Sequence, residues 1–340
     1  MPISPHADNY TLGRGVVYFD KKITATHYEG ERDLGNATTF AVALAIEKLE
    51  HFTSRSGLKA KDKTVITQIT PTMTFTLDEV NVENVALTFM AETTAVTQAA
   101  ADNLSAVLAY GYTGNRYYDL GDYRSVGVWK LQYDGGTGIF ARDEVLTGGT
   151  GSQTWIVLQV DGDVTSGTLY LGTKTGATDI VDDEVITGSV AGAAVANGVV
   201  TFDATDLCVS DSAANTTFFD KTTDFTVDST VGRIYIVAGG AIETAAASID
   251  VDFACSAASY TKIEPFDDEQ VEGRIRFVPD NPVGNNMELL FWRVDLAPGG
   301  EVGFIADDWQ TMEFTGEILK DETYHSSAPY GEILTSDTVT

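Results

Sequence analysis

The alternating stretch at residues 38–90 constrains the fold of this chain most. Within it, Phe40, Val42, Leu44 and Ile46 alternate with threonine or alanine. A period of two predicts a β-strand, because successive strand side chains point to opposite faces, although alanine by itself favours a helix. The face made of small residues would let another layer or another subunit approach closely. We therefore expect this stretch to form a surface that pairs with copies of itself.

A second strand and a short helix follow in the same stretch. Residues 64–77 alternate and are rich in threonine, valine and isoleucine, which favour strands, and Pro71 indicates a bulge or a sheet edge. Asn81 is a good helix N-cap, and Glu83 lies in the first turn, where the helix dipole favours an acidic side chain. Apolar residues at positions 82–89 recur at helical spacing. We expect a short amphipathic helix that packs on the sheet.

A basic segment, residues 49–63, connects the two strands. Ser54, Ser56 and Gly57 predict a turn, so the segment should form the tip of a long hairpin or a projecting arm. An ordinary solvated loop is one interpretation. The other is an arm that contacts acidic surface on a neighbouring copy, since the rest of the chain is short of positive charge. The basic residues of the segment are Arg55, Lys59, Lys61 and Lys63.

The acidic balance of the chain argues against several partners. Its 340 residues include 50 Asp and Glu against 21 Lys and Arg, a formal net charge of −29. Affinity for phosphates and for anionic membranes comes from Lys and Arg, so we expect neither a conventional nucleic-acid binder nor a membrane-docking protein. With 43% hydrophobic residues the chain can bury a core. Solubility, halophilic adaptation and a surface that repels polyanions remain as explanations of the charge.

The cysteines and the N-terminus indicate synthesis in a cytoplasm. Cys208 and Cys255 are the two cysteines of the chain, which is not a disulfide framework, and we expect two buried free thiols. Residues 1–10 have neither a basic region nor an apolar one, so we expect no secretory signal. No apolar run approaches about 18 residues, the length that a membrane-spanning helix needs. We therefore predict no membrane partner.

A change of composition divides the chain. Residues 139–260 are rich in Gly, Thr, Asp, Val and Ala, and short apolar runs recur in them between turn residues. This pattern predicts an inserted β-sandwich of about seven strands. Residues 1–138 and 261–340 share another composition, so we expect them to form one discontinuous β domain. The echo of DEVLTGG, from Asp143, in DEVITGS, from Asp183, indicates a weak repeat or only two similar hairpins.

The sequence contains no catalytic or metal-binding motif. The four histidines lack metal-ligand spacing to one another or to a cysteine, and no nucleotide-binding or nucleophile-elbow motif occurs. Acid pairs such as Asp267 and Asp268 could imitate a glycosidase site, but chance produces such pairs at this composition. We predict a protein that is not an enzyme and that uses no cofactor or metal.

Several segments resemble the major tail tube proteins of tailed bacteriophages. They are LGRGVVYFD from Leu12, DLGNATTFAVALAIEKLEHFTSRSGLKAKDK from Asp33, FTLDEVNVENVAL from Phe75, and WQTMEFTGEILKDE from Trp309 with HSSAPYG after it. The resemblance implies a mainly β fold, namely a tail-tube-type β-sandwich or half-barrel with a short flanking α-helix. It does not extend to the inserted segment, which would be an accessory immunoglobulin-like β-sandwich domain.

The resemblance also implies a function. Six copies would form a ring, and stacked rings would make a tube in the virion tail, assembled in the host cytoplasm. An acidic lumen would repel the phosphates of transiting DNA, which would then slide without sticking. The partners would be further copies of the chain and other tail proteins, such as a tape measure, a baseplate or a terminator protein.

The resemblance and the strand phase together suggest contact residues. The arm that reaches an adjacent ring would use Phe52, Arg55, Leu58, Lys59, Lys61 and Lys63. The candidate lumen acids are Glu47, Glu50, Glu313 and Glu317. The alternative function is another virion or surface structural protein, such as a decoration or glycan-binding adhesion module, which the inserted domain would favour. A carbohydrate-active enzyme is a third hypothesis.

Overall fold

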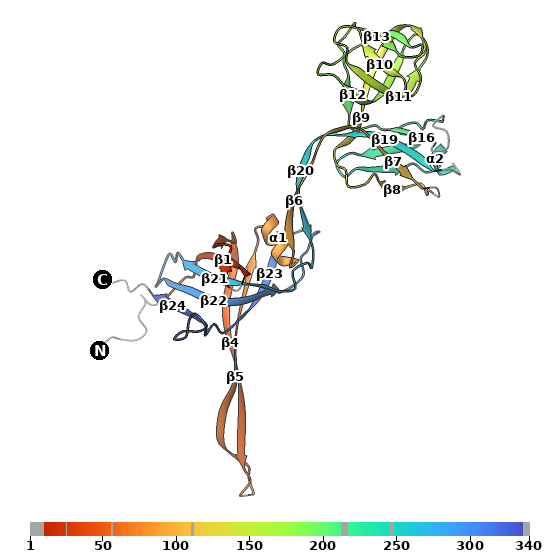
Figure 1. The fold of residues 1–340 in the computed structure, drawn as a ribbon. Helices are drawn as coiled ribbons and strands as arrows, with labels where there is room; N and C mark the ends of the chain where they lie inside the picture. Colours follow the sequence, from red (N-terminus) through yellow and green to blue (C-terminus); the bar gives the residue numbers. More distant parts are fainter. Residues whose placement is uncertain are drawn as a thin grey trace. The chain divides into compact units, whose positions relative to one another are not determined.

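The computed structural model describes residues 10–24, 26–55, 57–109, 112–211, 217–244 and 248–335. Over these residues the chain is mainly β with two short helices, which confirms the mainly β fold class that the sequence predicted (Figure 1). The chain divides into two compact units. Unit 1 consists of Met1–Ala95 and Thr261–Thr340, and unit 2 of Val96–Tyr260. No described helix is long and apolar enough to cross a membrane.

Unit 1 is built on one antiparallel sheet. Its strand order is β2-β1-β21-β22-β23-β5-β4, while β24 pairs with β22 and β3 pairs with β1. The elements of unit 1 are β1 (Gly15–Thr24), β2 (His27–Tyr28), β3 (Arg32–Asp33), β4 (Ala37–Thr53), β5 (Ala60–Leu77), α1 (Val82–Thr88), β21 (Val271–Pro279), β22 (Met287–Pro298), β23 (Met312–Ile318) and β24 (Gly331–Thr335). The chain passes between the units through β6 (Glu92–Gln98) and β20 (Ala258–Glu264), which pair with each other.

The core of unit 1 lies on one face of this sheet. Phe75 of β5 stacks on Phe314 of β23, with ring centroids 5.0 Å apart, and both side chains are fully buried. Helix α1 contacts β22 and β23. As the sequence predicts, Asn81 caps the helix, because its side chain accepts a hydrogen bond from the Asn84 backbone N–H at 2.8 Å. The buried Asn84 amide in turn donates to the Leu34 carbonyl at 2.9 Å, which fixes the helix to the loop before β4.

Unit 2 contains a large antiparallel sheet and a small one. Among the described residues the large sheet has the order β12-β11-β10-β13-β14-β9-β19-β16, with β15 also on β9 and β7 also on β19, and the small sheet has the order β17-β18-β8. The elements are β7 (Ala101–Leu108), β8 (Arg116–Asp119), β9 (Val126–Gly138), β10 (Val145–Gly148), β11 (Thr154–Gly162), β12 (Gly167–Thr175), β13 (Val185–Gly188), β14 (Ala193–Ala196), β15 (Thr201–Asp203), β16 (Cys208–Asp211), β17 (Phe225–Asp228), β18 (Arg233–Ile236), α2 (Ala241–Thr244) and β19 (Ile249–Cys255).

The first border of the inserted unit differs from the predicted one. The composition changes after residue 138, but unit 2 begins at Val96. The reason is strand pairing: β9, which ends at Gly138, pairs with β12, β14, β15 and β19, and β7 pairs with β19. The composition changes where β9 ends, but β9 lies inside the sheet, so the backbone hydrogen bonds of the sheet continue past this point. The second border, at Tyr260, coincides with the expected position.

Both cysteines are buried free thiols, as the sequence predicts. Burial raises the pKa of the Cys208 thiol to about 12. Such a thiol stays protonated at neutral pH and behaves as a small apolar side chain.

The sequence similarity between DEVLTGG, from Asp143, and DEVITGS, from Asp183, corresponds to a structural repeat. Asp143 and Asp183 both adopt left-handed backbone conformations, with φ of 64° and 61°. Strands β10 and β13, which follow them, pair antiparallel so that Thr147 lies opposite Thr187. The two equivalent threonines meet at the centre of this pairing, so the two segments are related by an approximate two-fold arrangement. The structure therefore favours the repeat over two unrelated hairpins.

The glutamates of the repeat hold each other's loops. Glu144, which is buried, accepts hydrogen bonds from the backbone N–H groups of Val190 at 2.6 Å and Gly192 at 3.2 Å, in the loop after β13. Glu184, also buried, accepts one from the Thr150 N–H at 2.6 Å, in the loop after β10. Each carboxylate thus satisfies backbone donors of the other half. Such charge-assisted bonds are the strong ones in proteins.

We predict that Glu144→Gln lowers the free energy of unfolding by about 2 kcal/mol, because a neutral amide replaces the charged acceptor of several backbone donors. Glu184→Gln should act in the same direction, since it removes the equivalent acceptor. Urea denaturation at neutral pH measures both effects. An unchanged midpoint in both variants would contradict the role of the repeat.

The same pair predicts a pH dependence. Burial acts to raise the pKa of Glu144, but hydrogen bonds from Ala141 and Val190 outweigh it and lower the pKa below its ordinary value of 4.5. A depressed pKa in the folded state contributes stability above the unfolded pKa, and this contribution is lost as the pH falls through the folded pKa. Below pH 4.5 the wild type should therefore lose stability more steeply than Glu144→Gln. Equal slopes in acid denaturation would refute this.

Candidate functional site

The β4–β5 hairpin continues beyond the sheet to which it belongs (Figure 1). Its strands pair from Ala37 opposite Leu77 to Thr53 opposite Ala60. Strand β23 pairs with β5 only as far as Thr72, so the outer part of β5 has no other strand partner in the described part of the chain. That outer part spans about 40 Å at the usual rise of a strand. Strand β4 is the last in the sheet order, which leaves its outer edge open within the described residues.

One face of the hairpin is apolar and uncovered. Strand alternation places Val42, Leu44 and Ile46 on the same face as the core residue Phe75, and Ile69 lies opposite Ile46. These four aliphatic side chains, the hairpin stripe, are 41% to 60% exposed. An exposed apolar surface on an open strand edge is a liability that isolated proteins avoid, so it indicates a contact surface.

The opposite face of the sheet is polar and carries an acidic row. Glu272, Asp295 and Glu317 lie opposite one another on β21, β22 and β23, and the row continues with Thr72 and Ala43. Directly opposite residues of antiparallel strands share a face. Arg293 neutralises Glu272 at 2.6 Å, whereas no ion pair involves Asp295 or Glu317 in the described chain. Like charges that oppose each other on paired strands, as those of Asp295 and Glu317 do, cost stability.

Three of the four predicted lumen acids lie on one face of the sheet and its hairpin. Glu313 and Glu317 project from the same face of β23, and Glu47 belongs to the same face of the hairpin by strand alternation. Glu50 belongs to the other face of β4 and forms an ion pair with Lys61. The sequence analysis missed Asp295, because only the register of β22 against β23 shows that it faces Glu317.

The predicted arm forms the hairpin tip, which we define as the described residues among 51–63. The side chains proposed for the inter-ring contact are all exposed, namely Phe52, Arg55, Leu58, Lys59, Lys61 and Lys63. Lys61 is held by Glu50, whereas no ion pair among the described residues involves Arg55, Lys59 or Lys63. Three cations at the tip are therefore available for an acidic partner.

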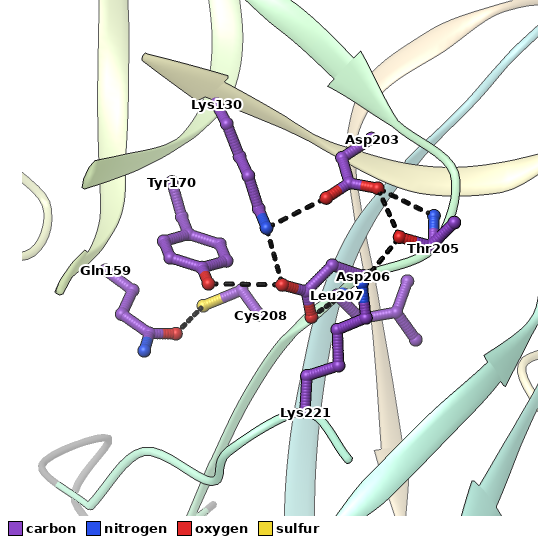
Figure 2. A network of polar contacts seen from close by, with 9 residues as sticks. All are labelled: Lys130, Gln159, Tyr170, Asp203, Thr205, Asp206, Leu207, Cys208 and Lys221. Carbon is purple, nitrogen blue, oxygen red and sulfur yellow. Dashed lines mark hydrogen bonds and ion pairs between the residues drawn. The ribbon is translucent and has the colours of Figure 1, made fainter. Parts of the chain in front are cut away.

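A network of buried and partly buried charges lies in unit 2 (Figure 2). The Lys130 ammonium donates to Asp206 at 2.5 Å and to Asp203 at 3.0 Å, and it lies over the Tyr170 ring, 4.7 Å from the centroid. Burial opposes the charge of Lys130, but the hydrogen bonds to the two carboxylates raise its pKa. Burial also acts to raise the pKa of Asp203, yet hydrogen bonds from Thr205 and Lys130 lower it to about 2.

A polar cleft of about 650 Å³ opens beside this network. It is lined by hydroxyl, amide and carboxylate groups with two aromatic rings, among them Gln132, Asp161, Thr168, Tyr170, Asn197 and Phe202. A lysine with a raised pKa stays protonated and cannot act as a base or a nucleophile at neutral pH. The arrangement is therefore suited to structure and to binding. The described residues contain no group of three His, Cys, Asp or Glu side chains that could hold a metal ion.

The chain is mainly β, and its β4–β5 hairpin leaves an apolar face and a strand edge uncovered within the described residues. Residues 10–122 and 161–334 match the family described as "Protein of unknown function UCP028589", and the chain belongs to this family. A comparison with curated proteins finds no match. The unmatched residues 123–160 contain β9, β10 and most of β11, so the family match omits the first half of the repeat.

We predict that Lys130→Met lowers the free energy of unfolding by about 3–5 kcal/mol, because it leaves the buried Asp206 carboxylate without its cation. The control is Lys320→Met, which removes an ion pair to Glu322 on the surface and should change stability far less, because exposed ion pairs contribute little. In that pair the two side chains are 50% and 67% exposed. Urea denaturation compares the two variants. Equal effects would mean that the network contributes no more than a surface pair.

Removing one charge of the acidic row should stabilise the isolated chain. We expect Glu317→Gln to raise the free energy of unfolding by about 0.5 kcal/mol, since Asp295 then faces a neutral side chain. Glu313→Gln is the matched control on the same strand, because its neighbour on β5 is the uncharged Thr76. Thermal unfolding of dilute protein at low salt distinguishes the two. A loss of stability in Glu317→Gln would contradict the cost of the row.

Proposed function

We propose that this chain is a structural subunit of a bacteriophage tail tube, in which hexameric rings stack around an acidic channel for DNA. The observation that supports this most is the β4–β5 hairpin. It joins an apolar face and an open strand edge to a sheet whose other face carries the acidic row. The proposal also draws on the resemblance of the sequence to tail tube proteins.

The apolar face and the open edge suit contact with further copies. The edge of β4 offers unpaired backbone donors and acceptors, which another strand can satisfy. Covering an aliphatic side chain fully stabilises by about 1.5–3 kcal/mol, so burial of the hairpin stripe would supply several kcal/mol per contact. Closed rings are the common outcome when identical subunits meet through a repeated interface. Contact with further copies would therefore explain why a folded chain leaves these side chains exposed.

The acidic face suits a channel through which DNA passes. Asp295, Glu313 and Glu317 present carboxylates from a face on which β5 contributes threonines and β4 contributes alanines. Carboxylates repel phosphates, and a net charge of −29 strengthens the repulsion. DNA would pass as cargo without recognition of its bases. The other partners would be the tape measure, baseplate and terminator proteins of the tail, and the site of action would be the virion.

The cleft of unit 2 favours a second candidate, a decoration or glycan-binding adhesion protein. Its neutral amides and hydroxyls beside the Tyr170 and Phe202 rings are groups that bind sugars. Retention of the full-length chain on a panel of immobilised neutral glycans, lost in Gln132→Ala, would support this candidate. Absence of any retention would remove it.

We predict that the double variant Leu44→Asp with Ile46→Asp stays folded and fails to assemble. Both side chains are exposed in the single chain, so the midpoint of thermal unfolding should change little, whereas burial of two carboxylates against a second copy is prohibitive. Ile139→Asp is the control, since it introduces a charge at an exposed isoleucine of unit 2. Negative-stain images and light scattering of concentrated protein should show rings or tubes for the wild type and the control. If the wild type stays monomeric under all nucleating conditions, the proposal is wrong.

A further inference from the structure

A second exposed apolar surface lies in unit 1, away from the hairpin stripe. Phe266, Phe304 and Ile305 are 78%, 69% and 98% exposed. With Phe89, whose ring lies 6.1 Å from that of Phe304 and 6.3 Å from that of Phe266, they form what we call the aromatic patch. Trp309, also exposed, belongs to the same loop as Phe304. A folded chain that exposes several large side chains together indicates a protein interface.

The backbone holds the patch in place. The Phe266 N–H donates to the Phe89 carbonyl at 2.9 Å, and the Asp268 N–H donates to the Met90 carbonyl at 2.9 Å. Lys21 holds the Asp268 carboxylate at 2.7 Å. Phe266 is therefore held beside Phe89, and preformed aromatic side chains are the usual anchors of interfaces.

The two segments that supply most of the patch are acidic. Residues 264–272 and the loop at residues 299–311 contain no Lys or Arg. The exposed acids of these two segments include Asp267, Glu269, Glu301, Asp307 and Asp308. An apolar centre with an acidic rim should bind a partner that has an apolar centre and a basic rim.

The hairpin tip has those properties. Residues 51–63 contain four Lys and Arg and one Asp, in a chain with a formal net charge of −29. Phe52 and Leu58 are exposed among these cations, at 47% and 79%. The tip and the patch thus match in charge and in apolar character.

The two surfaces lie at opposite ends of one strand. The loop at residues 299–311 leads into β23, whose first residue, Met312, pairs with Leu77 at the inner end of β5. The tip includes the outer end of the same strand, from Ala60 to Lys63, and this strand of 18 residues is about 60 Å long. An extended hairpin of this length cannot fold back onto the patch of its own chain. A contact between the two surfaces must therefore join two copies.

We propose that the hairpin tip of one copy docks on the aromatic patch of a second copy. Phe52 and Leu58 cover the patch, while Arg55, Lys59 and Lys63 pair with its acidic rim. Because the contact is head-to-tail, it leaves a free tip and a free patch at each end and can repeat without closing. The inference rests on the proposed function only in taking the hairpin as an assembly contact. It names the surface that receives the tip.

A charge exchange in the full-length chain tests this contact. Lys59→Glu with Lys63→Glu reverses the tip, and Glu301→Lys with Asp307→Lys reverses the rim; no ion pair in the described chain involves any of these four residues. Each reversed pair alone should raise the protein concentration for half-maximal assembly by about 10-fold or more. The chain that carries all four changes should assemble within about 3-fold of the wild type, because opposite charges face each other again. Failure of the fourfold variant to recover, or normal assembly of either reversed pair, overturns the inference.

Cross-linking separates this inference from the proposed function. Leu58→Cys and Ile305→Cys are made in separate full-length chains, in which Cys208 and Cys255 are buried. On mixing and mild oxidation, disulfide-linked heterodimers should form and should decrease with rising salt, since charge pairs guide the contact. Heterodimers without rings would support the inferred contact and contradict the tail tube function. Rings or tubes without heterodimers would support the tail tube function and contradict the inferred contact.

Discussion

The hydrogen-bonded ladder along β5 is the constraint on which unit 1 depends. Its inner part pairs with β23 and β4 and directs Met73, Phe75 and Leu77 into the core, whereas its outer part pairs only with β4 in the described chain. Because strand side chains alternate, the face of β5 that fills the core continues outward as the hairpin stripe. The opposite face, which is rich in threonine, continues into the acidic row. A slip of one residue would exchange the two faces, so fold and surface are set together.

Buried charges have a structural purpose in unit 2. Glu144 and Glu184 each accept several hydrogen bonds from the opposite half of the repeat, and Lys130 lies between two carboxylates and an aromatic ring. A buried charge is tolerated when its hydrogen-bonding capacity is filled in this way. These three charged side chains are therefore held in place by their neighbours. The polar cleft beside them is suited to binding.

The surfaces of unit 1 that do not help its stability are the ones on which the proposed assembly rests. Asp295 and Glu317 face each other, the hairpin stripe lies open, and Phe266 and Ile305 are largely exposed. Each of these features is unfavourable in an isolated chain. Each becomes favourable or neutral if further copies cover the apolar side chains and if the acidic face borders a channel for a polyanion. The proposed self-assembly would account for all three features.

The sequence by itself determined the local elements. Alternation predicted β4 and β5, and Asn81 predicted the start of α1, because strand period and helix caps are local properties. The basic tip was also evident from the sequence. Only the tertiary structure decided that unit 2 begins at Val96, that Asp295 faces Glu317, and that Glu144 and Glu184 hold each other's loops. These depend on the register between strands far apart in the chain, which backbone hydrogen bonds and core packing set and no local pattern encodes.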